Sequence, residues 1–218
     1  MKNILCFGDS NTFGYDTVND SRFSREIRWT GLIQKKLGKE YYVIEEGMGG
    51  RTTVWEDPIE NLQSGKDYLL SCLESHWPLD LVIIMLGTND LKARFGLSAY
   101  DIACGIETLV CMTKEFFKRK SQKQPEVLIV SPIEVDEEIV QRPYGIVMGG
   151  ISASERSHEF RKYYSMISER NQCHFLAASE FSAPCKEDCI HLDAEGHRML
   201  ADALVEKIDC ILNNVSDS

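Results

Sequence analysis

The sequence has little of what a membrane-spanning or secreted chain requires. No stretch of its 218 residues approaches the roughly 18 consecutive apolar residues of a membrane-spanning helix. The apolar run at residues 3–7 is far too short for a secretory signal peptide. We therefore expect a soluble, cytoplasmic protein that has no membrane partner.

Positive charge is also scarce. The chain carries 24 Lys and Arg against 34 Asp and Glu, a formal net charge of -10. Clustered Lys and Arg provide the sequence-independent affinity for nucleic acids, so this composition argues against a nucleic-acid partner. The one dense basic run, residues 118–120, is expected to end a helix, where the helix dipole favours cations.

Internal repeats, low-complexity segments and recognisable linkers are absent as well. A chain of this length with 43% hydrophobic residues can bury one sizeable core. We therefore predict one domain that spans residues 1–218.

Paired cysteines of the kind that bind structural zinc are missing. The eight cysteines are scattered and several lie inside apolar runs, which is typical of reduced, buried thiols. Cys185, Cys189 and His191 could offer three zinc ligands, but they lack a fourth ligand and the paired C-x-x-C spacing. The sequence therefore predicts no metal site.

Apolar runs alternate with amphipathic stretches along the chain, a pattern typical of βαβ units. The run at residues 80–86 is almost continuously apolar, as expected for a central strand buried on both faces. We predict an α/β fold in which helices cover both faces of a five-stranded parallel sheet. The expected strands lie at residues 3–7, 41–45, 80–86, 126–130 and 173–177, and the expected helices at 28–38, 58–75, 98–120, 152–170 and 193–213, the last with Asp193 as its N-cap.

Two segments that follow strands carry the elements of nucleophilic catalysis. Ser10 comes directly after the first strand, and its hydroxyl needs a base to become a good nucleophile. His191 closes the long loop after the fifth strand and has Asp188 three residues earlier. A carboxylate so placed can orient the imidazole while the other ring nitrogen faces the serine.

The other four histidines do not close a long loop after a strand. His76 ends a predicted helix, His158 lies inside another, and His174 begins a strand, so surface or packing roles are expected. His197, in the first turns of the last helix, is expected to pack or to hydrogen-bond locally.

Two further loops offer donors for an oxyanion, which an acyl-transfer site requires. Residues 47–53 follow the second strand, and a glycine such as Gly50 can present a backbone N–H without obstruction. Asn89 follows the central strand and supplies a side-chain amide. Because these loops follow parallel strands, we expect them to meet at one edge of the sheet.

Four blocks taken together resemble the SGNH (GDSL-type) hydrolase family. They are Gly8-Asp9-Ser10, Gly50 before Arg51-Thr52-Thr53, Gly87-Thr88-Asn89-Asp90 and Asp188-Cys189-Ile190-His191. The resemblance implies a three-layer α/β/α, flavodoxin-like fold. It also implies Ser10 as the nucleophile, His191 as the base and Asp188 as the orienting acid, with an oxyanion hole formed by the Ser10 and Gly50 backbone amides and the Asn89 side chain.

Further matches, at residues 28–31, 43–47 and 79–86, are similar to the small arylesterase/acyltransferase branch of that family. The branch implies hydrolysis of short-chain aryl and alkyl esters, acyl transfer to alcohols or peroxide in some members, homo-oligomers, and no metal or organic cofactor. We expect Asn11, Gly49, Tyr144 and Ile190 to contact the substrate. Asn11, where the family often has Leu, is expected to alter the polarity of the acyl pocket. Cys189, where it commonly has Gly, is expected to pack.

Two alternatives remain at this point. Residues 10–14 could be a hydroxyl-rich phosphate loop of a flavodoxin-like binding module, which would leave Asn89, Asp188 and His191 without a role. The same catalytic residues could also serve a carbohydrate or sialate O-acetylesterase.

The segment from Pro132 to Ile151 is long for a strand-to-helix connection. Its apolar end is expected to meet a neighbouring subunit through Tyr144, Ile146, Val147 and Met148, and to narrow the acyl channel.

Overall fold

Five parallel strands form the central sheet of the computed structural model, which describes residues 1–60 and 64–213. Their order across the sheet is β4-β1-β5-β6-β7, so the chain starts near the middle and winds outward in both directions. The strands are β1 (Lys2–Gly8), β4 (Tyr41–Gly47), β5 (Leu81–Met85), β6 (Glu126–Ser131) and β7 (His174–Ala177). The predicted parallel sheet is confirmed, with strand bounds close to those expected.

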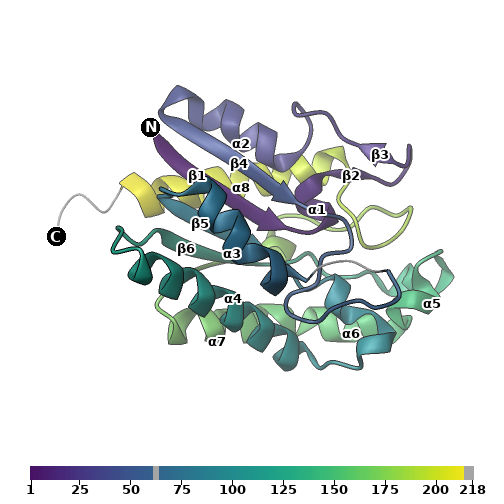
Figure 1. Cartoon of the computed structure of the whole chain (residues 1–218). Coiled ribbons are helices and arrows are strands. Elements are labelled where there is room, and N and C mark those ends of the chain that lie inside the picture. The colour runs from purple at the N-terminus through teal and green to yellow at the C-terminus, as the bar shows by residue number, and fades with distance from the viewer. Residues whose placement is uncertain (61–63, 214–218) are drawn as a thin grey trace.

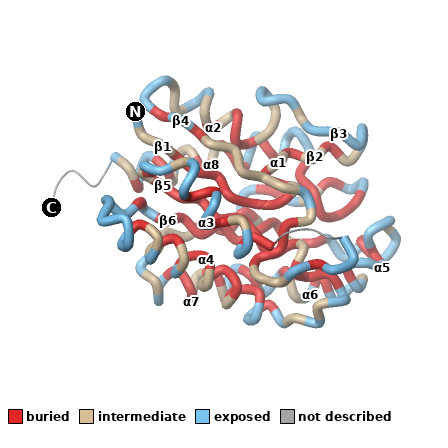
Figure 2. Tube along the Cα trace, in the orientation of Figure 1, coloured by how far each residue is buried: buried red, intermediate tan, exposed pale blue. Residues whose placement is uncertain are grey.

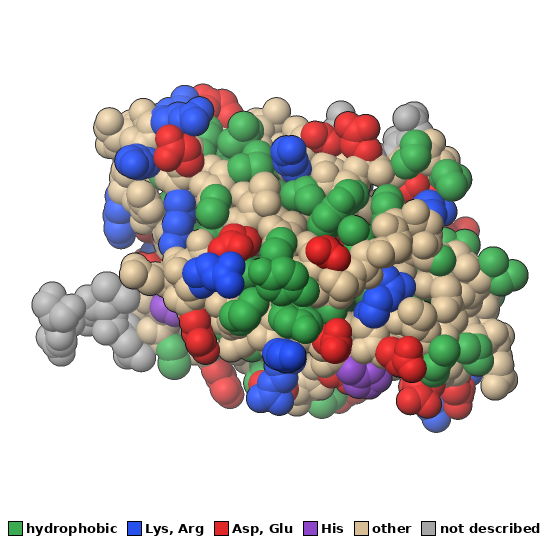
Figure 3. Space-filling view, turned by 90° about the horizontal axis from the view of Figure 1, so that it is seen from below, with side chains coloured by type: hydrophobic (Ala, Val, Ile, Leu, Met, Phe, Trp, Pro, Cys, Tyr) green, Lys and Arg blue, Asp and Glu red, His purple; other side chains and the backbone are tan. Residues whose placement is uncertain are grey.

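Helices cover both faces of this sheet (Figure 1). One face is covered by α2 (Trp29–Leu37) and α8 (Ala194–Asn213), and the other by α3 (Gly65–His76), α4 (Ala99–Arg119) and α7 (Phe160–Arg170). The three-layer α/β/α architecture is therefore as predicted. Seen from the α4 and α7 side, apolar side chains gather among charged ones on the outer surface (Figure 3).

The alternation of side chains along each strand divides the core in two. Ile4 and Cys6 of β1 pack with α2 and α8, whereas Leu5 and Phe7 pack with the helices of the opposite face. All five residues of β5 are buried, which explains why its sequence is apolar without alternation. Figure 2 shows the central strands as buried, whereas the edge strand β4 is mostly of intermediate burial.

Local signals set the helix ends, and two predicted helices differ from the structure. The helix expected at 58–75 begins at Gly65, where the Ser64 hydroxyl accepts from the Asp67 N–H; residues 61–63 lie outside the described part. The helix expected at 152–170 is two helices, α6 (Ile151–His158) and α7, separated at Glu159. Asp193 does precede α8 and accepts from the Gly196 N–H at 2.7 Å, as predicted for an N-cap.

Short elements occupy the long loops at the carboxyl edge of the sheet. After β1 come α1 (Ser10–Phe13) and the antiparallel pair β2 (Tyr15–Asp16) and β3 (Ser21–Arg22), and the segment after β6 contains α5 (Gly145–Met148). Single 3₁₀ turns lie at Gly38–Glu40, Asn89–Leu91, Ala93–Phe95, Glu137–Gln141 and Ala178–Glu180. The sequence did not predict these elements, because runs of two to five residues carry no periodicity.

None of the helices within the described residues is long and apolar enough to cross a membrane.

Candidate active site

Ser10 stands at the junction between β1 and α1. The Asp9 carboxylate accepts from the Asn11 N–H at 3.0 Å and so caps the first turn of α1. A side chain at Gly8 would meet the Met85 carbonyl oxygen at 2.7 Å, which is why the turn requires glycine there. This packing directs Ser10 to the carboxyl edge of the sheet, where the ligand crevice of such folds lies.

Ser10, His191 and Asp188 form a hydrogen-bonded line. The Ser10 Oγ lies 2.8 Å from the His191 Nε2, and the His191 Nδ1 lies 2.5 Å from the Asp188 Oδ2. The serine hydroxyl can donate to Nε2 while Nδ1–H donates to the carboxylate. The three residues come from opposite ends of the chain and meet as the spacing of the sequence blocks predicted.

Asp188 is held in its orientation by four more donors, one of which is the Cys185 thiol, whose Sγ lies 3.4 Å from Oδ1. Its Oδ1 accepts from the backbone N–H groups of Ile190 and His191, both at 2.9 Å, and its Oδ2 accepts from the Thr17 hydroxyl at 2.7 Å. Burial opposes ionisation, but the hydrogen bond and charge of His191 and these donors outweigh it and hold the pKa of Asp188 well below its usual range. Asp188 is therefore ionised at any pH at which the site could work. Sequence reasoning missed Thr17, which lies 171 residues away in the chain.

Donors suited to an oxyanion border the serine. Gly50 has a positive φ of 77°, which presents its backbone toward the pocket in a conformation that glycine adopts without strain. The Asn89 Nδ2 donates to the Arg51 carbonyl at 3.2 Å, which leaves the second amide hydrogen for a ligand. Within the described residues, the Ser10 and Gly50 backbone N–H groups have no hydrogen-bond acceptor. Both are thus available to an oxyanion.

Arg51 ties this donor loop to the nucleophile. Its guanidinium is buried, donates to the carbonyls of Gly8 and Glu46, and lies over the Phe7 ring at 4.4 Å. Burial lowers its pKa, which the charge of Glu46 partly offsets. The sequence identified Arg51 only as part of a block, because nothing in the pattern shows that it binds the strand end before Ser10.

Two buried carboxyl groups lie behind the site. Burial raises the pKa of Asp9 to about 6 and that of Asp90 to about 7, against the hydrogen bonds that each accepts. Asp90 accepts from the Thr53 N–H at 2.9 Å and from its hydroxyl at 2.6 Å. It thereby connects the loop after β4 to the loop after β5, which carries Asn89.

A pocket of about 260 Å³ opens over Ser10 and His191. Gly49, Tyr144 and Ile190 line it, as expected of substrate-binding residues, together with Val147 and Met148. The further lining residues are Tyr15, Gly50, Glu60, Thr88, Asn89 and Lys92.

Three of the pocket residues, Tyr15, Glu60 and Lys92, were missed by sequence reasoning. The Tyr15 ring meets the His191 ring edge-on, with 4.9 Å between centroids. Lys92 is buried, although it is a lysine, because its Nζ pairs with Asp57 at 3.1 Å and with Glu60 at 2.7 Å. A buried lysine has no distinctive neighbours in sequence, so no signal could have found it.

The role expected of Asn11 needs correction. Its side chain is buried and lies outside the pocket. Its Oδ1 accepts from the Leu192 N–H at 2.9 Å, and its Nδ2 donates to the Ile190 carbonyl at 3.3 Å. Asn11 therefore holds the histidine loop against α1 instead of contacting the substrate, because the first turn of α1 points its side chain inward.

The remaining histidines lie away from the serine. His197 is buried and its Nδ1 accepts from the Trp29 N–H at 3.3 Å, so the local bond expected of it is in fact a contact between α8 and α2. His158 and His174 pair with glutamates near the surface, as expected. His76 pairs with Glu46.

Cys189 is buried as expected and has a positive φ of 65°, the left-handed conformation that suits glycine.

A serine hydrogen-bonded to an acid-paired histidine, with amide donors beside it, is the arrangement found in serine hydrolases. The model of the GDSL-like lipase/acylhydrolase family matches residues 6–199, and the chain belongs to this family. Among solved structures, an aryl esterase from M. smegmatis is 37% identical with a TM-score of 0.90, covering 97% of this chain and 100% of that one. A carbohydrate acetylesterase from Sinorhizobium meliloti is 36% identical with a TM-score of 0.90 and the same coverage.

Curated protein sequences contain no significant match. The family and these neighbours confirm the resemblance to SGNH hydrolases. The chain is thus a carboxylic ester hydrolase, not the flavodoxin-like binding module that residues 10–14 alone allowed.

Proposed function

We propose that this chain hydrolyses short-chain aryl and alkyl esters through an acyl-enzyme on Ser10. The observation that carries the proposal is the unbroken line from the Ser10 Oγ to the His191 Nε2 and from the Nδ1 to Asp188, at 2.8 Å and 2.5 Å. This line opens into the pocket beside Asn89 and Gly50.

The chemistry follows from these positions. The Ser10 oxygen attacks the ester carbonyl as His191 takes its proton, and the oxyanion of the tetrahedral intermediate accepts from the Ser10, Gly50 and Asn89 donors. The protonated His191 then gives this proton to the leaving alcohol, and the acyl group remains on Ser10. Water, deprotonated by His191, attacks the acyl-enzyme, and His191 returns this proton to the Ser10 oxygen as the acid leaves. Ionised Asp188 stabilises the imidazolium in both halves.

The size and lining of the pocket favour small acyl groups. Its volume of about 260 Å³ is below the 300–1,000 Å³ of sites for drug-sized ligands. Val147, Met148 and Ile190 provide apolar contacts suited to a short acyl or aryl group. We therefore expect the rate of ester hydrolysis to fall steeply as the acyl chain of the substrate lengthens.

The test combines a substrate series with one variant. Nitrophenyl esters with acyl chains from two to twelve carbons should be hydrolysed fastest at the short end. Ser10→Ala should lose covalent labelling by a fluorophosphonate and lower the hydrolysis rate by several orders of magnitude. Ser165→Ala, which changes a part-exposed serine on α7, is the matched control. Undiminished labelling of Ser10→Ala would contradict the mechanism.

A carbohydrate O-acetylesterase is the second candidate. The Lys92–Glu60 ion pair places polar groups in the pocket wall, where they could bind sugar hydroxyls. The S. meliloti neighbour described as a carbohydrate acetylesterase supports the same reading. Including acetylated sugars in the substrate series separates the two. A higher kcat/KM for them than for nitrophenyl acetate would favour the sugar ester.

Acyl transfer to alcohols or peroxide is a further part of the proposal. The rings of Tyr15 and Tyr144 flank His191, which supports partial exclusion of water from the acyl-enzyme. Adding an alcohol should then yield a transfer ester beside the free acid.

A cytoplasmic location is supported by all eight cysteines being free thiols, as in reducing compartments.

A further inference from the structure

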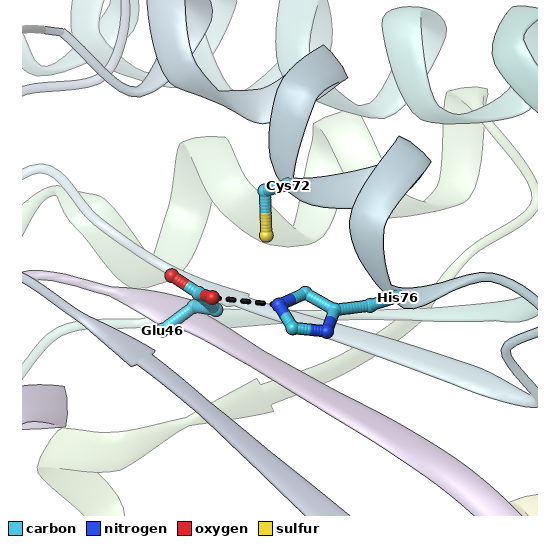
Figure 4. Close-up of side chains that lie close together, drawn as sticks. All are labelled: Glu46, Cys72 and His76. Atoms are coloured by element: carbon cyan, nitrogen blue, oxygen red, sulfur yellow. Dashed lines mark hydrogen bonds and ion pairs between the residues drawn. The ribbon is translucent and has the colours of Figure 1, made fainter.

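A second group of reactive side chains converges outside the catalytic pocket. The Glu46 carboxylate, the Cys72 thiol and the His76 imidazole offer ligand atoms that all lie within 4.8 Å of one another. Figure 4 shows the three side chains pointing toward one another, with the His76 Nε2 2.7 Å from the Glu46 Oε1. None of the three lines the pocket over Ser10.

The backbone holds these side chains in place through two regular elements. Cys72 and His76 are four residues apart on α3 and so share one face of the helix. Glu46 lies near the end of β4 and, because side chains alternate along a strand, faces opposite to Glu45, which pairs with Arg28. Sites built on a helix and a strand are more precise than sites on loops.

We propose that Glu46, Cys72 and His76 bind a zinc ion, with water as the fourth ligand. A thiolate, an imidazole and a carboxylate are the three side-chain groups that Zn²⁺ takes in proteins. Bond lengths of about 2.0 to 2.3 Å in a tetrahedron put ligand atoms roughly 3.3 to 3.8 Å apart. Separations of up to 4.8 Å must therefore close by up to about 1 Å, and the Glu46–His76 pair at 2.7 Å must open by roughly 0.6 Å, which rotation of these two part-exposed side chains can provide.

Access and charge fit a cation at this position. The His76 side chain is 29% exposed and that of Glu46 19%, so an ion and its water can enter from solvent, while Cys72 is buried beneath them. The carboxylate and a thiolate together neutralise Zn²⁺. The neighbouring positive charge of Arg51 opposes binding, but its guanidinium is occupied by the carbonyls of Gly8 and Glu46.

Binding must displace the thiol proton. A cysteine thiol buried as Cys72 is carries its proton at neutral pH in the absence of metal. The ion replaces this proton on sulfur, forming a Zn–S bond and releasing one H⁺ to the buffer. A proton count is therefore a direct signature of ligation by Cys72.

The experiment is a Co²⁺ titration of the reduced full-length protein, followed by displacement with Zn²⁺. We expect one Co²⁺ per chain with a thiolate-to-metal charge-transfer absorption, and calorimetry in two buffers should show about one proton released per ion. Cys72→Ser should abolish the absorption. His76→Gln should lower the affinity for Co²⁺ by at least about tenfold. Removing a group that only orients a metal ligand already lowers metal affinity by about that much, and His76 is itself a ligand.

Two control variants locate the ion. Cys173→Ser changes another thiol and should bind as the wild type does. His191→Ala tests whether the catalytic histidine is the ligand, and it should also retain binding. An absent charge-transfer absorption in the wild type, its persistence in Cys72→Ser, or loss of binding in His191→Ala with retention in His76→Gln would each overturn the proposal.

Discussion

At the scale of residues, the site depends on a small set of hydrogen bonds made by Asp188 and Asn89. Asp188 has five hydrogen-bond donors around its two oxygens, namely His191 twice, Ile190, Thr17 and the Cys185 thiol. Asn89 has one amide hydrogen on the Arg51 carbonyl and the other free for a ligand. Changes to single atoms at these positions should therefore alter catalysis more than stability.

Asn89→Ala should lower kcat by about 10²–10³ and change KM little, because the amide serves the oxyanion and not the ground-state carbonyl. Steady-state kinetics on a two-carbon ester measure both constants. A change confined to KM would make Asn89 a substrate-binding residue instead.

Thr17→Val should lower kcat/KM by up to about tenfold. A hydrogen bond to a charged group contributes about 1.5–3 kcal/mol, but four other donors still hold Asp188 and limit the loss. The matched control is Thr108→Val on α4, whose hydroxyl bonds only to a carbonyl of its own helix. Equal rates for the two variants would show that Thr17 does not position Asp188.

At the scale of elements, one contact links the ends of α2 and α8. The His197 Nδ1 of α8 accepts from the N–H of Trp29, the first residue of α2, which has no side-chain cap of its own. Burial, with the charge of His191, lowers the pKa of His197 to about 3. The neutral ring is thus the form that supports the fold.

This contact should make stability sensitive to acid. Between the unfolded pKa of about 6.5 and the folded value near 3, the unfolded chain binds the proton and the native chain does not. The contribution of His197 to stability therefore falls as pH drops through that window. His197→Gln, which keeps an acceptor, should lose this contribution, so between pH 6.5 and 4 its stability should move upward relative to that of the wild type.

Urea unfolding from pH 4 to 8 measures the effect, with His158→Gln as a surface control. The raised pKa values of Asp9 and Asp90 lower stability as pH rises from about 4 to 7. Both carboxyls titrate in the wild type and in both variants, so the difference between the wild-type and His197→Gln curves reports His197 alone. Parallel curves for wild type and His197→Gln would refute the assignment.

At the scale of the whole molecule, the segment after β6 remains a proposed subunit contact. Ile146 is 93% exposed, and Tyr144 and Val147 are part-exposed at the pocket mouth. Met148, expected to join them, is instead buried in the core of its own chain, because α5 turns it inward. The surface available to a second copy is therefore smaller than the sequence predicted.

Ile146→Asp should reduce the mass measured by light scattering and raise relative activity on eight-carbon over two-carbon esters, if a neighbouring copy narrows the channel. Met199→Asp, at an exposed apolar residue on α8, is the control. A monomeric wild type, or a variant with unchanged mass and chain-length profile, would contradict the proposal.

The sequence alone determined the strands of the sheet and the residues that follow them. The apolar runs set the strands, because a strand buried on both faces must be apolar throughout, as β5 is. Ser10, Asn89 and the pair Asp188 and His191 could be found because each follows a strand, and parallel strands bring their carboxyl ends to one edge. The sequence was therefore enough to predict at which edge of the sheet the site lies.

Tertiary structure decided what depends on contacts between distant segments. Thr17 reaches Asp188, Lys92 is buried by its acidic partners, and Asn11 turns inward to hold the histidine loop. Glu46 meets Cys72 and His76 only because β4 and α3 pack side by side. Such contacts leave no periodicity or spacing in the sequence, since they are fixed by the packing of layers and not by neighbours along the chain.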